Sequence, residues 1–73
     1  MNILSAEFIK NYIIGNRIYN LEIFYIEDYI HVFASYQTNN DTFEFELTGY
    51  GGHCSLKDVA IRSAILDLIQ QTQ

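Results

Sequence analysis

The chain has 73 residues, a length that supports one domain over residues 1–73 with one modest core, because small chains bury only about 60% of their unfolded surface. An apolar content of 49%, with five Phe and six Tyr, excludes a disordered chain and predicts a folded interior. Four Lys and Arg against nine Asp and Glu give a formal net charge of -5, which disfavours polyanions as partners and favours basic proteins.

The first predicted element is a helix that begins at Ser5 and ends at Gly15. Its apolar residues recur at helical spacing and are Phe8, Ile9, Tyr12 and Ile13. Ser5 is suited to cap the first turn, and Gly15 to end the helix in a left-handed conformation. Asn2 is an alternative cap, which would start the same helix one turn earlier.

Three strands are predicted next. Ile18–Ile26 and Ile30–Tyr36 are rich in β-branched and aromatic residues, and Glu27-Asp28 between them favours a turn, so we expect a hairpin. Thr42–Thr48 alternates strictly between apolar and polar residues. That alternation predicts a third strand with one face toward the core and one toward solvent.

The last predicted elements are a turn and a helix. Gly49-Tyr50-Gly51-Gly52 favours a turn after the third strand, and Ser55 with Asp58 resembles a capping box. The apolar stripe of the helix comprises Leu56, Val59, Ala60, Ala64, Ile65, Leu68 and Ile69. We therefore predict an α+β domain of order α-β-β-β-α, a three-stranded antiparallel sheet with two helices packed on one face.

No motif of the sequence predicts catalysis, a metal or a cofactor. His31, His53 and Cys54 lack the separated ligand pairs of a zinc site. Cys54 beside His53 has no third catalytic group at a recognisable offset. The glycines before the second helix fit a phosphate cradle less well than an ordinary turn. We expect a protein that is not an enzyme.

The candidate binding site is the sheet face that the helices leave open. Period-two alternation places Glu22 and Phe24 of the first strand on this face with Phe33 of the second. Glu44 and Glu46 of the third strand join them. Aromatic side chains ringed by carboxylates suit a basic protein surface that has apolar pockets. An alternative left open is that Phe24 and Phe33 pair across strands to support the sheet, or lie in a homodimer interface.

Cysteine usage and hydropathy indicate a soluble, cytoplasmic protein. The single Cys54 excludes an internal disulfide, which fits a reducing compartment. The sequence shows neither a signal peptide nor an apolar run of about 18 residues that would span a membrane. Because a core of this size rarely supplies more than a few kcal/mol, homodimerisation is a further expectation.

The segment Thr48–Ala60, together with the order α-β-β-β-α, resembles the double-stranded RNA-binding domain. In that family a glycine-containing turn leads into a basic helix start that grips phosphates, and Lys57 is the matching residue here. The same ending is similar to HicB-type antitoxins, whose related domain binds a small basic RNA-cleaving toxin. The size and acidity are similar to phage-encoded inhibitors such as anti-CRISPR proteins, some of which occupy the nucleic-acid-binding surface of a bacterial defence complex.

These observations lead to one hypothesis and one alternative. The hypothesis is a protein-binding module that blocks or modulates a basic, nucleic-acid-binding partner, such as a CRISPR-type defence complex. The residues assigned to contact are Glu22, Phe24, Phe33, Glu44 and Glu46. The alternative is a degenerate RNA-binding-like or antitoxin-like domain that binds RNA or an RNA-cleaving toxin. Its basic patch would comprise Lys10, Arg17, Lys57 and Arg62.

Overall fold

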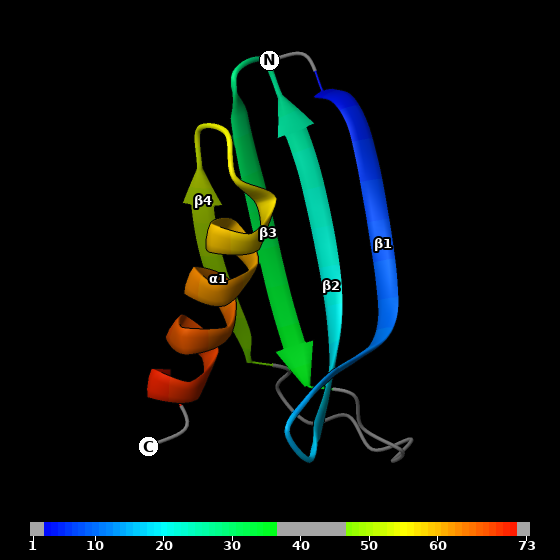
Figure 1. Ribbon diagram of the computed structural model, residues 1–73, viewed down its shortest axis with the longest axis vertical. Helices are drawn as coiled ribbons and strands as arrows, with labels where there is room; N and C mark the ends of the chain where they lie inside the picture. Colours follow the sequence, from blue (N-terminus) through cyan, green and yellow to red (C-terminus); the bar gives the residue numbers. More distant parts are fainter. Residues whose placement is uncertain (1–2, 37–46, 72–73) are drawn as a thin grey trace.

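The computed structural model describes residues 3–36 and 47–71. Over these residues, four strands form one antiparallel sheet in the order β1-β2-β3-β4, followed by one helix (Figure 1). The elements are β1 Ile3–Ile14, β2 Arg17–Ile26, β3 Tyr29–Tyr36, β4 Thr48–His53 and α1 Lys57–Gln71. The α+β class is as predicted. The predicted three strands and two helices are wrong, because the described chain has four strands and a single C-terminal helix.

The helix α1 lies across β3 and β4 on one face of the sheet, while β1 and β2 extend beyond it (Figure 1). The buried residues come from alternate positions of the strands and one stripe of the helix. They are Tyr19, Leu21, Ile23, Ile30, Val32, Ala34, Ala60, Ile61, Ala64, Ile65 and Leu68. We call this side of the sheet the helix side and the opposite side the open face.

The predicted hairpin is confirmed. β2 pairs antiparallel with β3, with Ile26 opposite Tyr29 across the turn at Glu27 and Asp28. Glu27 has a left-handed φ of 52°, which a tight turn requires of one of its residues. The register is regular along the whole pair, so period-two alternation holds on both strands.

The largest correction concerns residues 5–15, predicted as a helix, which belong to β1 and the following turn. β1 carries a bulge between Ile9 and Tyr12, where Asn11 has a left-handed φ of 63°. The extra residue puts Ile9 and Tyr12, three positions apart, on the same side of the sheet. Because a helix produces the same spacing, the apolar pattern of this strand mimics a helix. Gly15, with φ 62°, lies in the β1–β2 turn and ends no helix.

The second correction concerns residues 49–52, predicted as a turn, which lie within β4. Gly49 and Gly51 face α1, and a Cβ at Gly51 would collide with the helix backbone at Ala60 and Ala64. These two glycines therefore permit close packing of the strand against the helix. Residues 49–52 form a strand, so neither the predicted turn nor the less favoured phosphate cradle is present there.

The predicted second helix is confirmed as α1. Most of the predicted strand Thr42–Thr48 lies outside the described residues, including Glu44 and Glu46. Leu47, an apolar residue of that predicted alternation, precedes β4 and is 42% exposed, and Thr48 begins β4. Over residues 3–36 and 47–71, no helix has the length and hydropathy to cross a membrane.

Glu7 ties β1 to β2 and α1. Its Oε1 accepts hydrogen bonds from the Tyr25 hydroxyl at 3.1 Å and from Lys57 Nζ at 3.3 Å. The hydrogen bond and attraction of the Glu7 carboxylate raise the pKa of Lys57 above its usual range. Burial, followed by the bond to Glu7, raises the pKa of Tyr25. Both groups are at least partly exposed, so water screens this network and its contribution is small.

We expect Glu7→Gln to lower the free energy of unfolding by less than about 1 kcal/mol at neutral pH. A raised folded pKa stabilises the fold below the unfolded pKa and loses that contribution as pH rises through the folded value. Lys57 and Tyr25 both have raised pKa values, so the stability difference between wild type and variant should begin to fall once the pH passes the ordinary pKa values of about 10–10.5, and should be lost above the raised folded pKa values. Urea unfolding of both proteins at neutral and alkaline pH measures this difference in the free energy of unfolding. A difference that persists or grows at alkaline pH would contradict this assignment.

Candidate functional site

The open face is set by the β2–β3 register. Glu22 lies opposite Phe33, and Phe24 lies opposite His31. Their chain neighbours Leu21, Ile23, Val32 and Ala34 are buried on the helix side. Because side chains alternate along a strand, Glu22, Phe24, His31 and Phe33 share the open face.

Four aromatic rings, one from each strand, form a continuous row across this face. Phe8 of β1 lies 6.2 Å from Phe24 of β2 between ring centroids, in an edge-to-face arrangement. Phe24 lies 5.9 Å from Phe33 of β3, and Phe33 lies 5.2 Å from Tyr50 of β4. These separations fall within the range of favourable aromatic pairs. We call Phe8, Phe24, Phe33 and Tyr50 the aromatic row.

Two further rings, both from β3, lie beside Tyr50 on the open face. The ring centroids of Tyr29 and His31 are 5.0 Å apart, and His31 Nδ1 lies 2.6 Å from the Tyr50 hydroxyl, a hydrogen-bond distance. Gly52 lies opposite His31, and a Cβ there would meet the Tyr29 ring at 2.6 Å. The absence of a side chain at Gly52 therefore makes room for these rings.

The structure brings part of the predicted site together. Glu22 is exposed, and Phe24 and Phe33 are half-buried and pair across the strands as the open alternative expected. Glu44 and Glu46 lie outside the described residues. Sequence reasoning missed Phe8 and Tyr50, because they fell in segments predicted as a helix and a turn. Both are accessible, with Phe8 65% and Tyr50 44% exposed.

Lys57, Arg17 and Arg62 do not form one patch, and the fourth residue of the predicted basic patch, Lys10, is exposed on β1 where the bulge begins. Lys57 is bonded to Glu7 in the first half of β1, whereas Arg17 pairs with Ile14 at the end of β1. Glu7 and Ile14 are seven residue steps apart along the strand, or about 20 Å. The Arg17 guanidinium carbon lies 5.5 Å from the ring centroid of Tyr36 on the helix side, and Arg62 is on α1. The exposed Glu22 therefore has none of these three cations beside it on the open face.

His53 is the last residue of β4 and has a structural role, and Cys54 follows it. His53 Nδ1 accepts hydrogen bonds from the backbone N–H groups of Ser55 at 3.0 Å and Leu56 at 2.9 Å. The Cys54 Sγ is exposed and lies 4.0 Å from the same nitrogen. The lone pair of His53 Nδ1 therefore accepts backbone hydrogen bonds and is not available to take a proton from the Cys54 thiol. His31 is on the open face, so the three soft ligands do not meet, and no metal-binding group of three or more ligands occurs within the described ranges.

Substitution of His53 tests whether its bonds to the backbone stabilise the start of α1. The first helical bond runs from Ala60 N to Leu56 O, so Ser55 lies before the cap position and the predicted capping box is wrong. We expect His53→Ala to cost about 1 kcal/mol, as other lost caps do. Ser55→Ala, the matched control, should change stability by only a few tenths of a kcal/mol. Thermal unfolding measures both, since about 1 kcal/mol shifts Tm by roughly 4–8 °C in a chain of this size. Equal losses of stability in His53→Ala and Ser55→Ala would contradict the role of His53 as a cap of α1.

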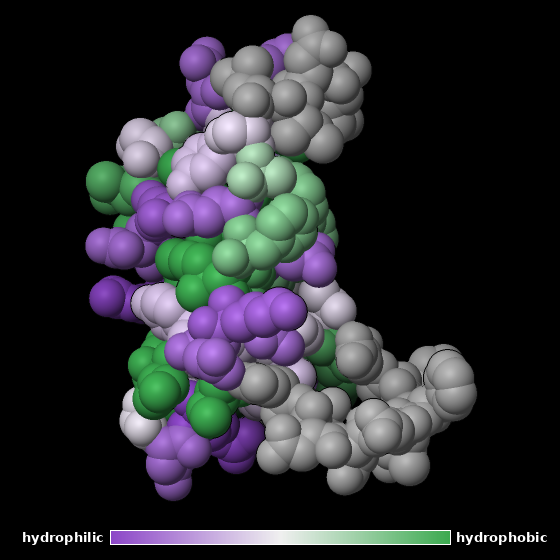
Figure 2. Space-filling view, turned by 90° about the vertical axis from the view of Figure 1, so that its right-hand side faces the viewer, coloured by the Kyte–Doolittle hydropathy of each residue, from purple (hydrophilic) through white to green (hydrophobic). Residues whose placement is uncertain are grey.

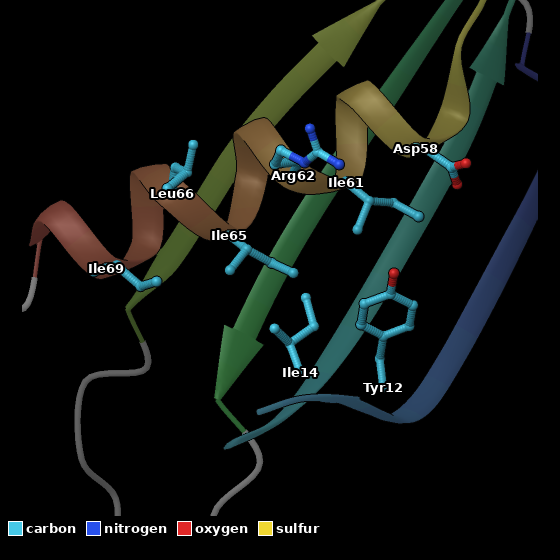
Figure 3. Close-up of a pocket in the computed structure, with 8 residues that line it drawn as sticks. All are labelled: Tyr12, Ile14, Asp58, Ile61, Arg62, Ile65, Leu66 and Ile69. Atoms are coloured by element: carbon cyan, nitrogen blue, oxygen red, sulfur yellow. The ribbon is translucent and has the colours of Figure 1, made fainter. Parts of the chain in front are cut away.

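A hollow of about 530 Å³ lies on the helix side, between α1 and the end of β1 (Figure 3). It exists because α1 covers β3 and β4 and leaves this part of the sheet uncovered. Its lining residues are Tyr12, Ile14, Asp58, Ile61, Arg62, Ile65, Leu66 and Ile69. Six are apolar, and the two charged residues have opposite signs, so the hollow offers hydrophobic contact with no net charge.

Comparisons with protein-family models, with curated proteins and with solved structures found no match. The function must therefore be inferred from the surface of the chain itself. The aromatic row with the exposed Glu22 is the most distinctive part of that surface.

Proposed function

We propose that this chain is a non-enzymatic protein-binding module that binds a basic protein through the aromatic row on the open face of its sheet. The observation that carries the proposal is the row itself, four adjacent rings on a face that no described element covers. Contiguous exposed aromatic surface on a small protein typically marks an interaction site. Aromatic side chains are also the commonest anchors of protein interfaces.

Charge supports a basic partner. The formal net charge of -5 attracts a cationic surface over long range and speeds association at low salt. Glu22 lies between Phe8 and Phe33 in the register, opposite each of them on neighbouring strands. A Lys or Arg of the partner would therefore meet a carboxylate and aromatic faces at one place, where cation–π attraction adds to the ion pair. Such pairs orient the complex and exclude acidic partners.

The biological role that we propose is to block or modulate that partner. A basic protein surface large enough to accept an aromatic row is often a nucleic-acid-binding surface, because phosphate neutralisation requires clustered cations. Occupation of that surface by an acidic module competes with nucleic acid. The similarity in size and acidity to small phage-encoded inhibitors favours a bacterial defence complex as one such partner.

The test is capture of the partner by the immobilised chain from lysate of the native host, with and without nuclease, at low and moderate salt. We expect a basic protein that survives nuclease and is released as salt increases, because the attraction is screened beyond about 8 Å at physiological ionic strength. A chain whose surface is altered in the aromatic row, described in the Discussion, is the control. Recovery of nucleic acid alone, lost on nuclease treatment, would refute the proposal.

A further inference from the structure

The two edges of the sheet differ in their protection. At the β4 edge, the backbone N–H of Tyr50 donates to Asp67 Oδ2 at 3.0 Å, and Gln71 Nε2 donates to the Thr48 carbonyl oxygen at 2.9 Å. Gln71 also donates to Asp67 at 3.1 Å, which holds both helix side chains in place. A further strand could pair with β4 only by displacing these bonds. The helix therefore blocks the β4 edge.

Among the described residues, the β1 edge has no such protection. β1 is the terminal strand on the other side of the sheet, and α1 lies over β3 and β4, away from it (Figure 1). Within residues 3–36 and 47–71, no side chain bonds to the outer backbone of β1 in the way that Asp67 and Gln71 bond to β4. Open backbone donors and acceptors along an edge strand are a template for another strand.

The usable part of this edge is short. The pairing of β1 with β2 shifts register between Ile3 and Ser5 and again between Ile9 and Tyr12, so the chain from Ser5 to Ile9 is the regular run. Bulges twist an edge away from a partner and limit pairing to the segment between them. The irregular ends of β1 therefore restrict where an added strand aligns.

We propose that a second copy of this chain pairs antiparallel with the β1 edge, with Phe8 of one copy opposite Phe8 of the other. Such a dimer has a twofold axis between the two β1 strands. The open faces of the two copies lie side by side only if this axis passes through one residue, which is then opposite its own copy. An axis at Glu7 would place two carboxylates opposite each other, which is unfavourable. An axis at Ile9 would bring the bulge into the ladder. The axis at Phe8 keeps the carboxylates apart, pairs Glu7 with Ile9 and brings the two Phe8 rings together, which an axis at Ala6 would not do. Regular pairing about this axis then ends at Ile9, where the bulge begins.

Exposure and charge favour a second copy over other occupants. Phe8 ends the aromatic row at the β1 edge and is 65% exposed, so pairing joins two rows into one across eight strands. Glu7 is neutralised locally by Lys57, and Figure 2, which faces the β1 side, shows hydrophobic and hydrophilic residues intermixed there. A strongly basic strand would lie beside Lys10, an exposed cation of β1 itself. A copy of the same edge meets no like-charge repulsion in the ladder.

The dimer does not rest on the proposed function, and the salt dependence of the two kinds of association distinguishes them. Each copy carries a net charge of -5, so salt screens the repulsion between copies and should tighten the dimer, whereas it should weaken binding to a basic partner. Sedimentation equilibrium at low and high salt measures the dimer dissociation constant. A chain that stays monomeric at millimolar concentration and high salt would overturn the pairing and leave the partner proposal intact.

Charged variants of Phe8 test the geometry. Phe8→Asp should weaken the dimer by about tenfold or more, because two carboxylates replace an aromatic pair at the axis. Phe8→Lys should do the same, and a mixture of the two variants should restore association as a heterodimer, because opposite charges then face each other. Rescue on mixing occurs only if residue 8 faces its own copy.

The controls use the same strand. Ile13 is on the open face beyond the bulge and is 64% exposed, so Ile13→Asp is matched to Phe8→Asp in exposure and should leave the dissociation constant nearly unchanged. Circular dichroism checks that each variant is folded. Amide hydrogen exchange of the wild type should show added protection in residues 5–9 on dimerisation. Dimerisation that is indifferent to Phe8→Asp, or protection confined to α1, would refute the β1 pairing.

Discussion

Gly51→Ala should lower the free energy of unfolding by about 3 kcal/mol or more, the upper end of the cost of overpacking. A Cβ at Gly51 would overlap the backbone of α1 at Ala60 and Ala64. Backbone atoms inside a helix cannot move aside as a flexible side chain does. The helix must therefore shift off β4, and the core between them opens.

The size of this loss is large for such a chain. At about 0.05–0.15 kcal/mol per residue, 73 residues give a total stability of roughly 4–11 kcal/mol. The substitution therefore removes a quarter of the stability or more and should lower Tm by about 12 °C or more. Thermal and urea unfolding measure the loss.

The matched control lies one residue away in the same strand. A Cβ at Gly52 would meet the rings of Tyr29 and Tyr50, which are side chains that can rotate outward on the open face. We expect Gly52→Ala to cost about 1 kcal/mol, with the helix still in place. If Gly51→Ala were no more damaging than Gly52→Ala, the close packing of α1 against β4 would be wrong.

The sequence predicted the parts of the fold in which the apolar pattern has one explanation. In β2 and β3 the register is regular, so period-two alternation was enough to predict that Phe24 and Phe33 share one face of the sheet. Their neighbours Leu21, Ile23, Val32 and Ala34 are buried on the other face. The helix α1 was equally plain from its apolar stripe.

The pattern failed in β1 because a bulge changes the period of a strand. With one extra residue at the bulge, the spacing between the apolar residues Ile9 and Tyr12 is three residues instead of two, as it would be in a helix. Two signals favoured a strand: the abundance of Ile and aromatic residues, and Asn11, a residue type that tolerates the left-handed conformation found there.

The glycines of β4 were misassigned for a different reason. Glycine usually marks a turn, but Gly49 and Gly51 are two residues apart, which is the period of one strand face. On α1, Ala60 and Ala64 are small residues one turn apart, and they lie against these glycines. That match of small residues was visible in the sequence, although it becomes meaningful only when the helix and the strand are known to pack together.

These two errors also hid half of the aromatic row. Phe8 and Tyr50 belong to β1 and β4, so a sheet without these strands left the open face with only its two central rings. The structure thus changes the candidate site from an isolated aromatic pair with carboxylates into a surface that spans all four strands. The contribution of carboxylates beyond Glu22 depends on Glu44 and Glu46, which lie outside the described residues.

Phe33→Ala should weaken binding to the partner by about 30-fold or more, which corresponds to the loss of a hot spot of about 2 kcal/mol. Phe33 is the anchor that we expect to matter most, because its ring contacts both Phe24 and Tyr50 and lies inside the row. Hot spots gather at the centre of an interface, where surrounding contacts exclude water. The measurement is the dissociation constant by titration with the partner isolated in the capture experiment.

Controls separate binding from folding. Phe33 is half-buried, so its truncation also removes two aromatic contacts and should cost about 1–3 kcal/mol of stability. Phe33→Leu keeps an apolar side chain on the sheet, should remain folded, and should still bind more weakly than the wild type. Ile18→Ala changes an exposed apolar residue on the same face outside the row and should bind normally. If folded Phe33→Leu and Phe33→Ala both bound as tightly as the wild type, the aromatic row would be a structural feature of the sheet, and the partner would bind elsewhere.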